Sequence, residues 1–460
     1  MTDSSQPCGS GDKPSTMEDR WSAQQALRAG AEGFRRAVGC LGETFRIPGH
    51  RGNQRGRDRR NFALAVTVLV AATWPGLKAH ATPQFARTYN MSCTACHSIP
   101  PRLNIKGLSF KARGYRLSPD FGGQSEATLP LSVWLTGTSE EQASKDFSEL
   151  FLSKVELISG GPIGEDLSYF VEWRAVSQQT RSDGSLRDRS GRFEDAYLTW
   201  QVDDRSSLTV GQYRALNQVD VSRRLSISEP AVFSTSLAGD PSSDPRIGSL
   251  RAFSPAGRSP GFTYELHSIQ GEAPSDGLFH YVTVPFVGEL SIPLTSEAKD
   301  EASFELEGPP KGVFLETFYR SGLNSIGAHA FIDDDRWLVT GAGVLNIADW
   351  LNGRGPPLSS GDQGVLPLYL TGALGIGDRD GGSSRVRSSL EVEYLFTKFD
   401  ALRAGLGFRV EHVTNAGRDP AYIPYFVLSG PNQQHTFLLQ VQYRAQEEND
   451  ALLIGLSWLF

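Results

Sequence analysis

The chain is 460 residues long, and its 45 basic and 52 acidic residues give a formal net charge of −7. By length alone it could form two or three domains. An acidic chain of this kind is a poor partner for nucleic acid, which selects basic surfaces. Four cysteines are present, and only Cys93 and Cys96 lie close together in the sequence.

The first sixty residues are rich in Gly, Ser and Arg and have no sustained hydrophobic periodicity. We therefore expect residues 1–60 to be a disordered leader, or to reflect a mis-assigned translation start, and exclude them from the fold. Cys8 and Cys40 lie in this leader.

Residues 61–81 have the order of regions found in a secretory signal peptide. Arg59 and Arg60 precede the apolar run 62–74, and the small-residue site Ala79-His80-Ala81 follows it. The run is too short for an ordinary membrane span, although an uncleaved anchor is the alternative. Cleavage after Ala81 would leave 33 basic and 45 acidic residues, a net charge of −12 on an exported protein.

The sequence MSCTACH contains Cys93, Cys96 and His97 in the order C-x-x-C-H. A zinc ribbon would need a second pair of ligands, and a thioredoxin-like motif would need a βαβ context, and both are missing. The pattern is typical of covalent attachment of one c-type haem, in which the two thiols bond the porphyrin and His97 is the proximal iron ligand. An incidental dithiol is the alternative.

Residues 82–128 are expected to form the haem-bearing segment. Fewer than fifty residues separate Thr82 from the first predicted strand near Leu129, which is below the size at which a chain usually buries an adequate core. We therefore predict that the segment packs as a plug inside a host domain. A flexible periplasmic tether is the alternative.

Residues 129–460 alternate apolar and polar side chains in segments of about eight to twelve residues, separated by Gly, Asp, Asn and Ser. Leu390 and Val392, for example, alternate with Ser389, Glu391 and Glu393. A soluble β-sandwich also alternates in this way. The length of the strands and the terminal aromatic Phe460 favour an all-β transmembrane antiparallel barrel in the outer membrane.

About sixteen such strands can be counted, within two. An even count returns both ends of the barrel to the periplasm, so long loops should follow odd-numbered strands. The stretches Gln178 to Gly191 and Ala215 to Pro260 obey this expectation. The connection Ile347 to Gly364 does not, because it falls on the periplasmic side.

The stretch PQFARTYNMSCTACHSIPPRLNIKGLSFKARGYRL resembles the N-terminus of the fused porin–cytochrome outer-membrane proteins of iron-oxidising bacteria. The likeness is specific over Phe85 to Leu117 and only architectural over Val133 to Phe460. It implies a mono-haem cytochrome joined to a barrel of about sixteen strands. It also implies extracellular Fe(II) oxidation, with the electron passed through the haem to a periplasmic carrier such as a c-type cytochrome.

Strand parity predicts that His267 and His329 point into the barrel, which makes them candidates for the distal iron ligand. Either could instead be an ordinary lumen histidine. Met91 lies too close to Cys93 to reach around the haem ring. The other barrel histidines are expected at the rim or are ambiguous: His412, His435 and His280.

No hydrolytic constellation and no phosphate-cradling glycine loop is found in the sequence. The acidic turn Asp333-Asp334-Asp335 could hold a hard cation, but charged turns are usually only solvated. Two functions of different classes therefore compete. The first is an electron conduit with possible Fe(II) oxidase activity, or the same conduit run outward to an external acceptor. The second is a diffusion porin with a haem-bearing periplasmic appendage.

Overall fold

The computed structural model describes much of the chain from Gln84 onward. The described residues are 84–89, 91–117, 130–142, 151–180, 186–188, 190–220, 224–234, 256–269, 274–286, 288–291, 303–306, 312–333, 336–347, 368–379, 385–396, 402–414, 419–430, 436–446 and 450–459. The predicted leader, the predicted signal peptide and Phe460 lie outside them.

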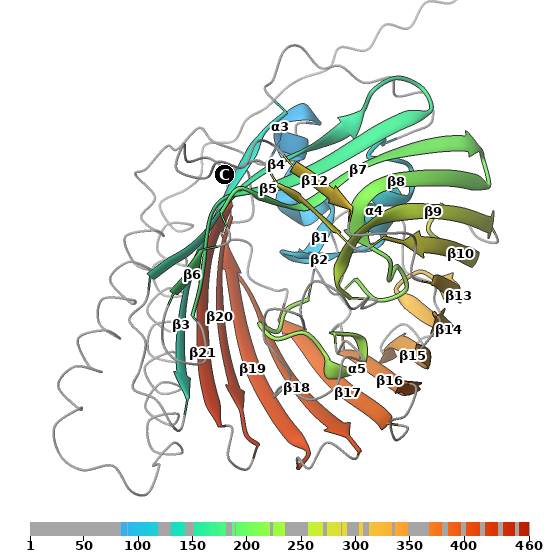
Figure 1. Cartoon of the computed structure of the whole chain (residues 1–460). Coiled ribbons are helices and arrows are strands. Elements are labelled where there is room, and N and C mark those ends of the chain that lie inside the picture. Colours follow the sequence, from blue (N-terminus) through green and yellow to red (C-terminus); the bar gives the residue numbers. More distant parts are fainter. Residues whose placement is uncertain are drawn as a thin grey trace, which may run out of the picture. The chain divides into compact units, whose positions relative to one another are not determined.

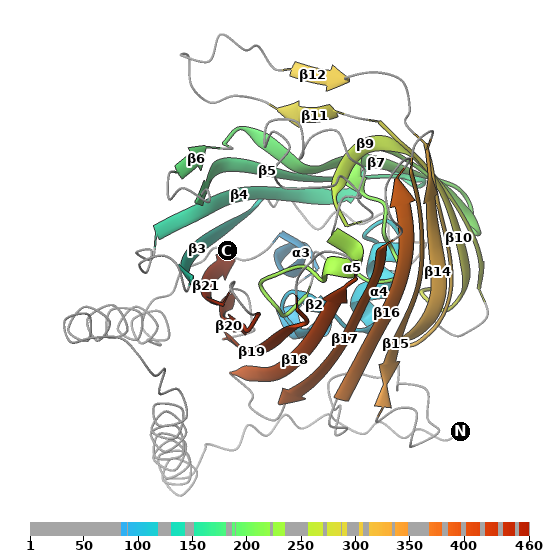
Figure 2. The ribbon, with the colours of Figure 1, turned by 60° about the horizontal axis from the view of Figure 1, so that its bottom comes forward.

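Sixteen strands form a closed antiparallel barrel (Figures 1 and 2), as the alternation predicted. In chain order they are β3 (Ser132–Gln142), β4 (Phe151–Pro162), β5 (Leu167–Thr180), β7 (Arg192–Asp203), β8 (Ser206–Arg214), β9 (Arg258–Ile269), β10 (Gly277–Pro285), β13 (Val313–Ser321), β14 (Asn324–Ile332), β15 (Arg336–Asn346), β16 (Leu368–Arg379), β17 (Arg385–Phe396), β18 (Arg403–Val413), β19 (Ala421–Gly430), β20 (Thr436–Arg444) and β21 (Ala451–Leu459). The last strand pairs with the first, from Ala451 opposite Gln142 to Leu459 opposite Trp134, and this pairing closes the sheet.

Three short strands extend the pairing in the connections between barrel strands: β6 (Leu186–Asp188), β11 (Gly288–Ser291) and β12 (Ser303–Leu306). The smaller elements near the beginning of the described chain are α3 (Gln84–Thr88), η1 (Cys93–Ala95), β1 (His97–Ile99), β2 (Arg102–Leu103) and α4 (Ile105–Ala112). The short helix α5 (Ala231–Ser234) lies in the connection between β8 and β9. No helix among the described residues is both long and apolar enough to cross a membrane.

The two faces of the barrel differ sharply in chemistry because side chains alternate along each strand. The outward face is apolar: Ile326 is 70% exposed and Leu374 is 61% exposed. Buried charged side chains point the other way, and Arg409 on β18 has no exposed surface at all. An apolar exterior around a polar interior is the pattern of barrels that span membranes.

The lengths of the connections follow the predicted parity. Short turns at 163–166, 204–205 and 322–323 lie at the end of the barrel where β3 begins and β21 ends. β8 ends and β9 begins at the opposite end, as the parity predicted for the long connection between them. The exception expected at Ile347 to Gly364 is also found, because the connection from β15 to β16 follows the tenth barrel strand.

Residues 215–234 fold back into the barrel after β8. The backbone N–H of Gln218 donates to Glu316 on β13 at 2.8 Å, and its side chain donates to the carbonyl of Ala342 on β15 at 2.8 Å. Further along, the N–H of Ala231 donates to Glu411 on β18 at 3.1 Å. The described residues 215–220 and 224–234, which we call the inward loop, therefore reach from β8 to the far wall of the barrel.

Residues 84–117, the N-terminal segment, also contact strands that lie nearly opposite one another in the closed sheet (Figure 2). Gln84 donates to the carbonyl of Gly160 on β4 at 3.0 Å. Arg403 on β18 donates to the carbonyls of His97 and Ser98. Arg102 forms an ion pair with Glu393 on β17. The segment thus bridges the interior of the barrel near the end where β3 begins.

An apolar cluster joins the N-terminal segment, the inward loop and the barrel wall. Ile99 of the segment and Leu225 of the loop are both almost completely buried. They pack in one cluster with inward-facing wall residues, namely Tyr369, Leu395, Tyr425, Val427 and Leu438. The burial of apolar surface on all three partners stabilises their arrangement.

We expect a charge on the outward face to destabilise the barrel strongly. Leu374 lies in the middle of β16, so Leu374→Arg should lower the free energy of unfolding by about 2–4 kcal/mol in lipid vesicles. Urea unfolding followed by tryptophan fluorescence measures this difference, and Leu374→Ala is the uncharged control. Equal stability of the two variants would mean that this face lies in water.

Candidate functional site

The two cysteines lie in a tight loop that is fixed by its own backbone. Cys93 begins the short helix η1, and the N–H of Cys96 donates to the carbonyl of Cys93 at 3.2 Å. Cys93 is buried and Cys96 is partly buried, and they form no disulfide. Both sulfur atoms are therefore held within one turn of chain.

Asn104 ties this loop to the start of α4. Its side-chain oxygen accepts the N–H of Gly107 at 3.0 Å, which caps the helix. Its amide group donates to the carbonyls of Thr94 and Ala95 at 3.3 and 3.1 Å. Asn104 thus caps the first turn of α4 and also holds the cysteine loop by hydrogen bonds to two of its carbonyl groups.

Gly107 permits a close approach between α4 and the cysteine loop. A Cβ atom at this position would lie 2.2 Å from the carbonyl oxygen of Cys96 and 2.8 Å from Cδ2 of Leu103. The first of these contacts is with backbone, which cannot rotate away. The absence of a side chain at residue 107 is therefore needed for the position of Cys96.

His97 follows directly and is held by the chain just beyond it. Its Nδ1 lies 2.9 Å from the carbonyl oxygen of Pro101. With the proton on Nδ1, the ring donates to this carbonyl, and Nε2 is the nitrogen that carries the lone pair. In metal sites, a hydrogen bond from the ring nitrogen that does not bind the metal fixes the orientation of the histidine.

The two thiols do not have the character of reactive cysteines. Burial raises the pKa of the Cys93 thiol to about 11 and also raises the pKa of Cys96. Redox-active cysteines need thiolates and hence lowered pKa values. The pair therefore lacks the lowered thiol pKa that is typical of a dithiol–disulfide couple.

A cavity of about 500 Å³ lies against these residues. It is lined on one side by Cys93, Cys96 and His97, and elsewhere by the inward loop and by β3, β4, β5, β20 and β21. Its apolar lining includes Phe85, Met91, Phe110, Ile158 and Leu438. The volume and the mixture of apolar and polar walls are those of a small-molecule or cofactor site.

Stacked aromatic rings fix one wall of the cavity. Tyr115 of the N-terminal segment stacks on Phe85 and on Phe170 of β5, with centroid distances of 5.2 and 5.6 Å. The hydroxyl of Tyr115 lies 2.7 Å from that of Tyr197 on β7. These contacts attach the segment to the strands opposite β17 and β18.

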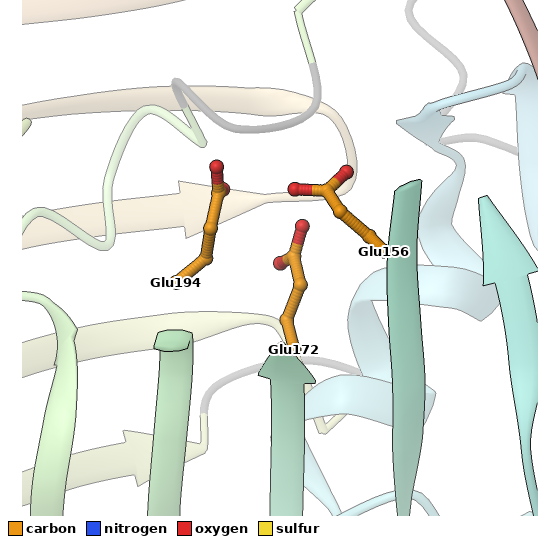
Figure 3. Close-up of side chains that lie close together, drawn as sticks. All are labelled: Glu156, Glu172 and Glu194. Carbon is orange, nitrogen blue, oxygen red and sulfur yellow. The ribbon is translucent and has the colours of Figure 1, made fainter. Parts of the chain in front are cut away.

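Charged side chains line another part of the cavity. Oxygens of Glu156, Glu172 and Glu194, on β4, β5 and β7, lie within 4.8 Å of one another (Figure 3). Lys154 lies 2.6 Å from Glu156, and Glu194 is paired with Arg174 and Arg258. A metal ion would have to compete with three cations already present, so we assign no metal site to this cluster.

The predicted orientation of the two candidate distal histidines is confirmed. His267 is buried inside, stacked on Phe279 at 4.9 Å, and His329 is buried beside Phe314 at 5.4 Å. Neither is among the described residues that line the cavity, whereas Met91 is. The role of His267 or His329 as an iron ligand remains a prediction.

The other sequence candidates have separate places. His280 donates to or accepts from Thr317 at 3.1 Å on the outward face, and His412 lies near the end of β18. His435, Asp334 and Asp335 lie outside the described residues. Three site residues were missed in the sequence: Pro101, Asn104 and Gly107. An Asn followed by a helical pattern is a helix-start signal and could have identified Asn104.

Searches of protein-family models and of curated proteins found no match. Among solved structures, the chain is similar to the outer membrane channel DcaP of Acinetobacter baumannii, with 14% identity, a TM-score of 0.39, and coverage of 72% of this chain and 96% of that one. It is similar to Salmonella typhi OmpF in complex with daunomycin, with 13% identity, a TM-score of 0.44 and coverage of 72% and 97%. An anion-selective porin from Comamonas acidovorans has 10% identity, a TM-score of 0.43 and coverage of 72% and 98%.

We expect Gly107→Ala to open the cysteine loop. The added methyl group must push α4 away from Cys96, and overpacking of this kind costs about 1–3 kcal/mol. In protein produced without haem attachment, maleimide labelling of Cys96 should become roughly tenfold faster or more. The exposed neighbour Lys106→Ala is the control, and an unchanged labelling rate in Gly107→Ala would contradict the close approach.

Proposed function

We propose that the protein is an outer-membrane electron-transfer protein with one covalent c-type haem. Cys93 and Cys96 would attach the haem, and His97 would be the proximal ligand through Nε2. The observation that carries the proposal is that these three side chains line a cavity that also has barrel walls. A haem held there would be surrounded by the barrel, which insulates it from lipid.

Each residue of the site has a task in this proposal. Pro101 orients the His97 ring through Nδ1, and Asn104 and Gly107 fix the loop that carries the thiols. The apolar part of the lining would contact the porphyrin. The bound haem would supply a one-electron couple between Fe(III) and Fe(II).

The donor that the resemblance implies is extracellular Fe(II). One Fe(II) would give one electron to the oxidised haem and leave as Fe(III), and a periplasmic carrier such as a c-type cytochrome would then reoxidise the haem. The same parts would serve electron export to an external acceptor if the haem potential were low enough. The reduction potential of the haem therefore decides in which direction the electrons move.

A diffusion porin is the second candidate function, and the barrel itself favours it. Sixteen strands enclose enough space for an aqueous channel, and the inward face is polar and charged. Against free diffusion, the N-terminal segment and the inward loop both cross the interior. The haem segment would then be an appendage rather than the working part.

Anaerobic optical spectroscopy tests the first function. The mature protein, produced with haem-maturation factors and purified in detergent, should contain one thioether-linked haem that Fe(II) reduces with one electron per chain. Cys93→Ser/Cys96→Ser should lack the covalent haem and the reaction. If the haem is attached but stays oxidised after Fe(II) is added, the favoured function becomes the diffusion porin or electron export. Protein without haem would refute the assignment of Cys93, Cys96 and His97.

Channel conductance tests the second function. If the N-terminal segment blocks the interior, the intact protein should conduct weakly in planar bilayers, and a variant lacking residues 84–117 should conduct severalfold more. Heat-modifiable mobility on gels verifies that the shortened barrel is folded. High conductance of the intact protein would contradict the plug and support the diffusion porin.

A further inference from the structure

Arg214, the last residue of β8, lines the same cavity as the two cysteines and His97. Its Nη1 donates to Oε1 of Glu229 at 2.8 Å and to the carbonyl of Ala256. Two partners on one nitrogen hold the guanidinium group in a fixed orientation. The group is mostly buried, with 14% of the side chain exposed.

The Nε side of this guanidinium group has a hydrogen-bond donor that is not used. Nε of Arg214 is buried and has no hydrogen-bond partner among the described residues. A buried donor without a partner is costly and uncommon in folded proteins. Nε–H is also half of the side-on fork with which an arginine binds both oxygens of a carboxylate.

Ionised side chains of both signs surround Arg214. Glu229 is shared between Arg214 and Arg224, at 2.8 and 3.4 Å. Arg258 lies directly opposite Arg214 on β9 and is itself paired with Glu172, Glu194 and Asp195. The pKa of Arg224 is lowered to about 10, chiefly by burial and also by its cationic neighbours Arg214, Arg409 and Arg258, while Glu229 opposes the shift.

Glu229 stays ionised in this setting. Burial would raise the pKa of its carboxyl group, but Arg214 and Arg224 outweigh burial and lower it. Nη1 of Arg214 is therefore held by Glu229, and Nε is the donor of this group that remains for a ligand in the cavity.

We propose that Arg214 is the principal residue of a carboxylate-binding subsite, and that the subsite holds a propionate group of the haem attached at Cys93 and Cys96. The inference rests on the proposed function, since it names residues that would hold the same cofactor. Free carboxylate solutes passing through a porin have the same chemistry and are the other source of such a ligand. The shared cavity and the missing partner of Nε favour the haem.

A guanidinium group beside the haem also sets its reduction potential. Reduction adds one negative charge, so a nearby positive charge favours the reduced haem and a nearby negative charge disfavours it. Arg214 and Glu229 lie in one ion pair but have opposite signs. Their removal should therefore move the potential in opposite directions.

The experiment compares Arg214→Gln and Glu229→Gln in the full-length haem-loaded protein by spectroelectrochemical titration. At a fixed ambient potential, Arg214→Gln should lower the ratio of reduced to oxidised haem roughly tenfold, which is 59 mV for one electron. Glu229→Gln should raise the ratio. Arg214→Lys should restore part of the shift, because it keeps the charge but not the fork. Arg387→Gln removes a buried inward charge that does not line the cavity, and should have a smaller effect.

The possible outcomes separate this inference from the proposed function. Shifts of the same sign in both variants would mean that breaking the ion pair disturbs the fold, and would overturn the subsite. An attached haem with the same potential in wild type and Arg214→Gln would also overturn it, while the proposed function would stand. In that case, the channel current is measured with and without succinate. If succinate blocks the current of the wild type but not that of Arg214→Gln, Arg214 is assigned to the binding of solutes. Absence of haem from every variant would refute both proposals.

Discussion

The rest of the structure depends on the closure of the sheet by β3 and β21. Closure removes the edges of the sheet, but sixteen strands enclose more space than their own inward side chains can fill. Within the described residues, two segments that are not part of the barrel sheet occupy that space. The N-terminal segment spans the interior near the end where β3 begins, and the inward loop reaches across it from β8.

These two segments stabilise each other as well as contacting the wall. Ile99 and Leu225 share one apolar cluster, and Lys111 lies 3.2 Å from Asp220. The ion pair is partly exposed and contributes little by itself. The apolar contact and the polar contacts to the wall carry most of the arrangement, and the cavity at Cys93, Cys96 and His97 is the space left between the segments and the wall.

The sequence contains local information about the barrel strands, and these were predicted correctly. The assignment of Cys93, Cys96 and His97 to a haem stays a prediction. Alternation separated Leu390 and Val392 from Glu391 and Glu393, and the first pair is exposed while the second is buried, because the period of a strand is two. Contacts between distant residues could not be predicted in this way. Arg403 reaches His97 across 306 positions of sequence, and Arg214 and Cys93 share a cavity only because β8 and the N-terminal segment border the same interior. Periodicity contains no information on which inward side chains meet.

The burial of Cys93 bears on the order of assembly. Only 8% of this residue is exposed once the segment is packed, and the cysteine loop is closed by Asn104 and by the contact at Gly107. Thioether formation needs both sulfur atoms to reach a porphyrin, and a thiol that is neutral and enclosed is slow to react. On the proposed function, haem attachment must therefore precede the packing of residues 84–117 into the barrel. The covalent bonds would then keep the cofactor with the chain while the sixteen strands close around it.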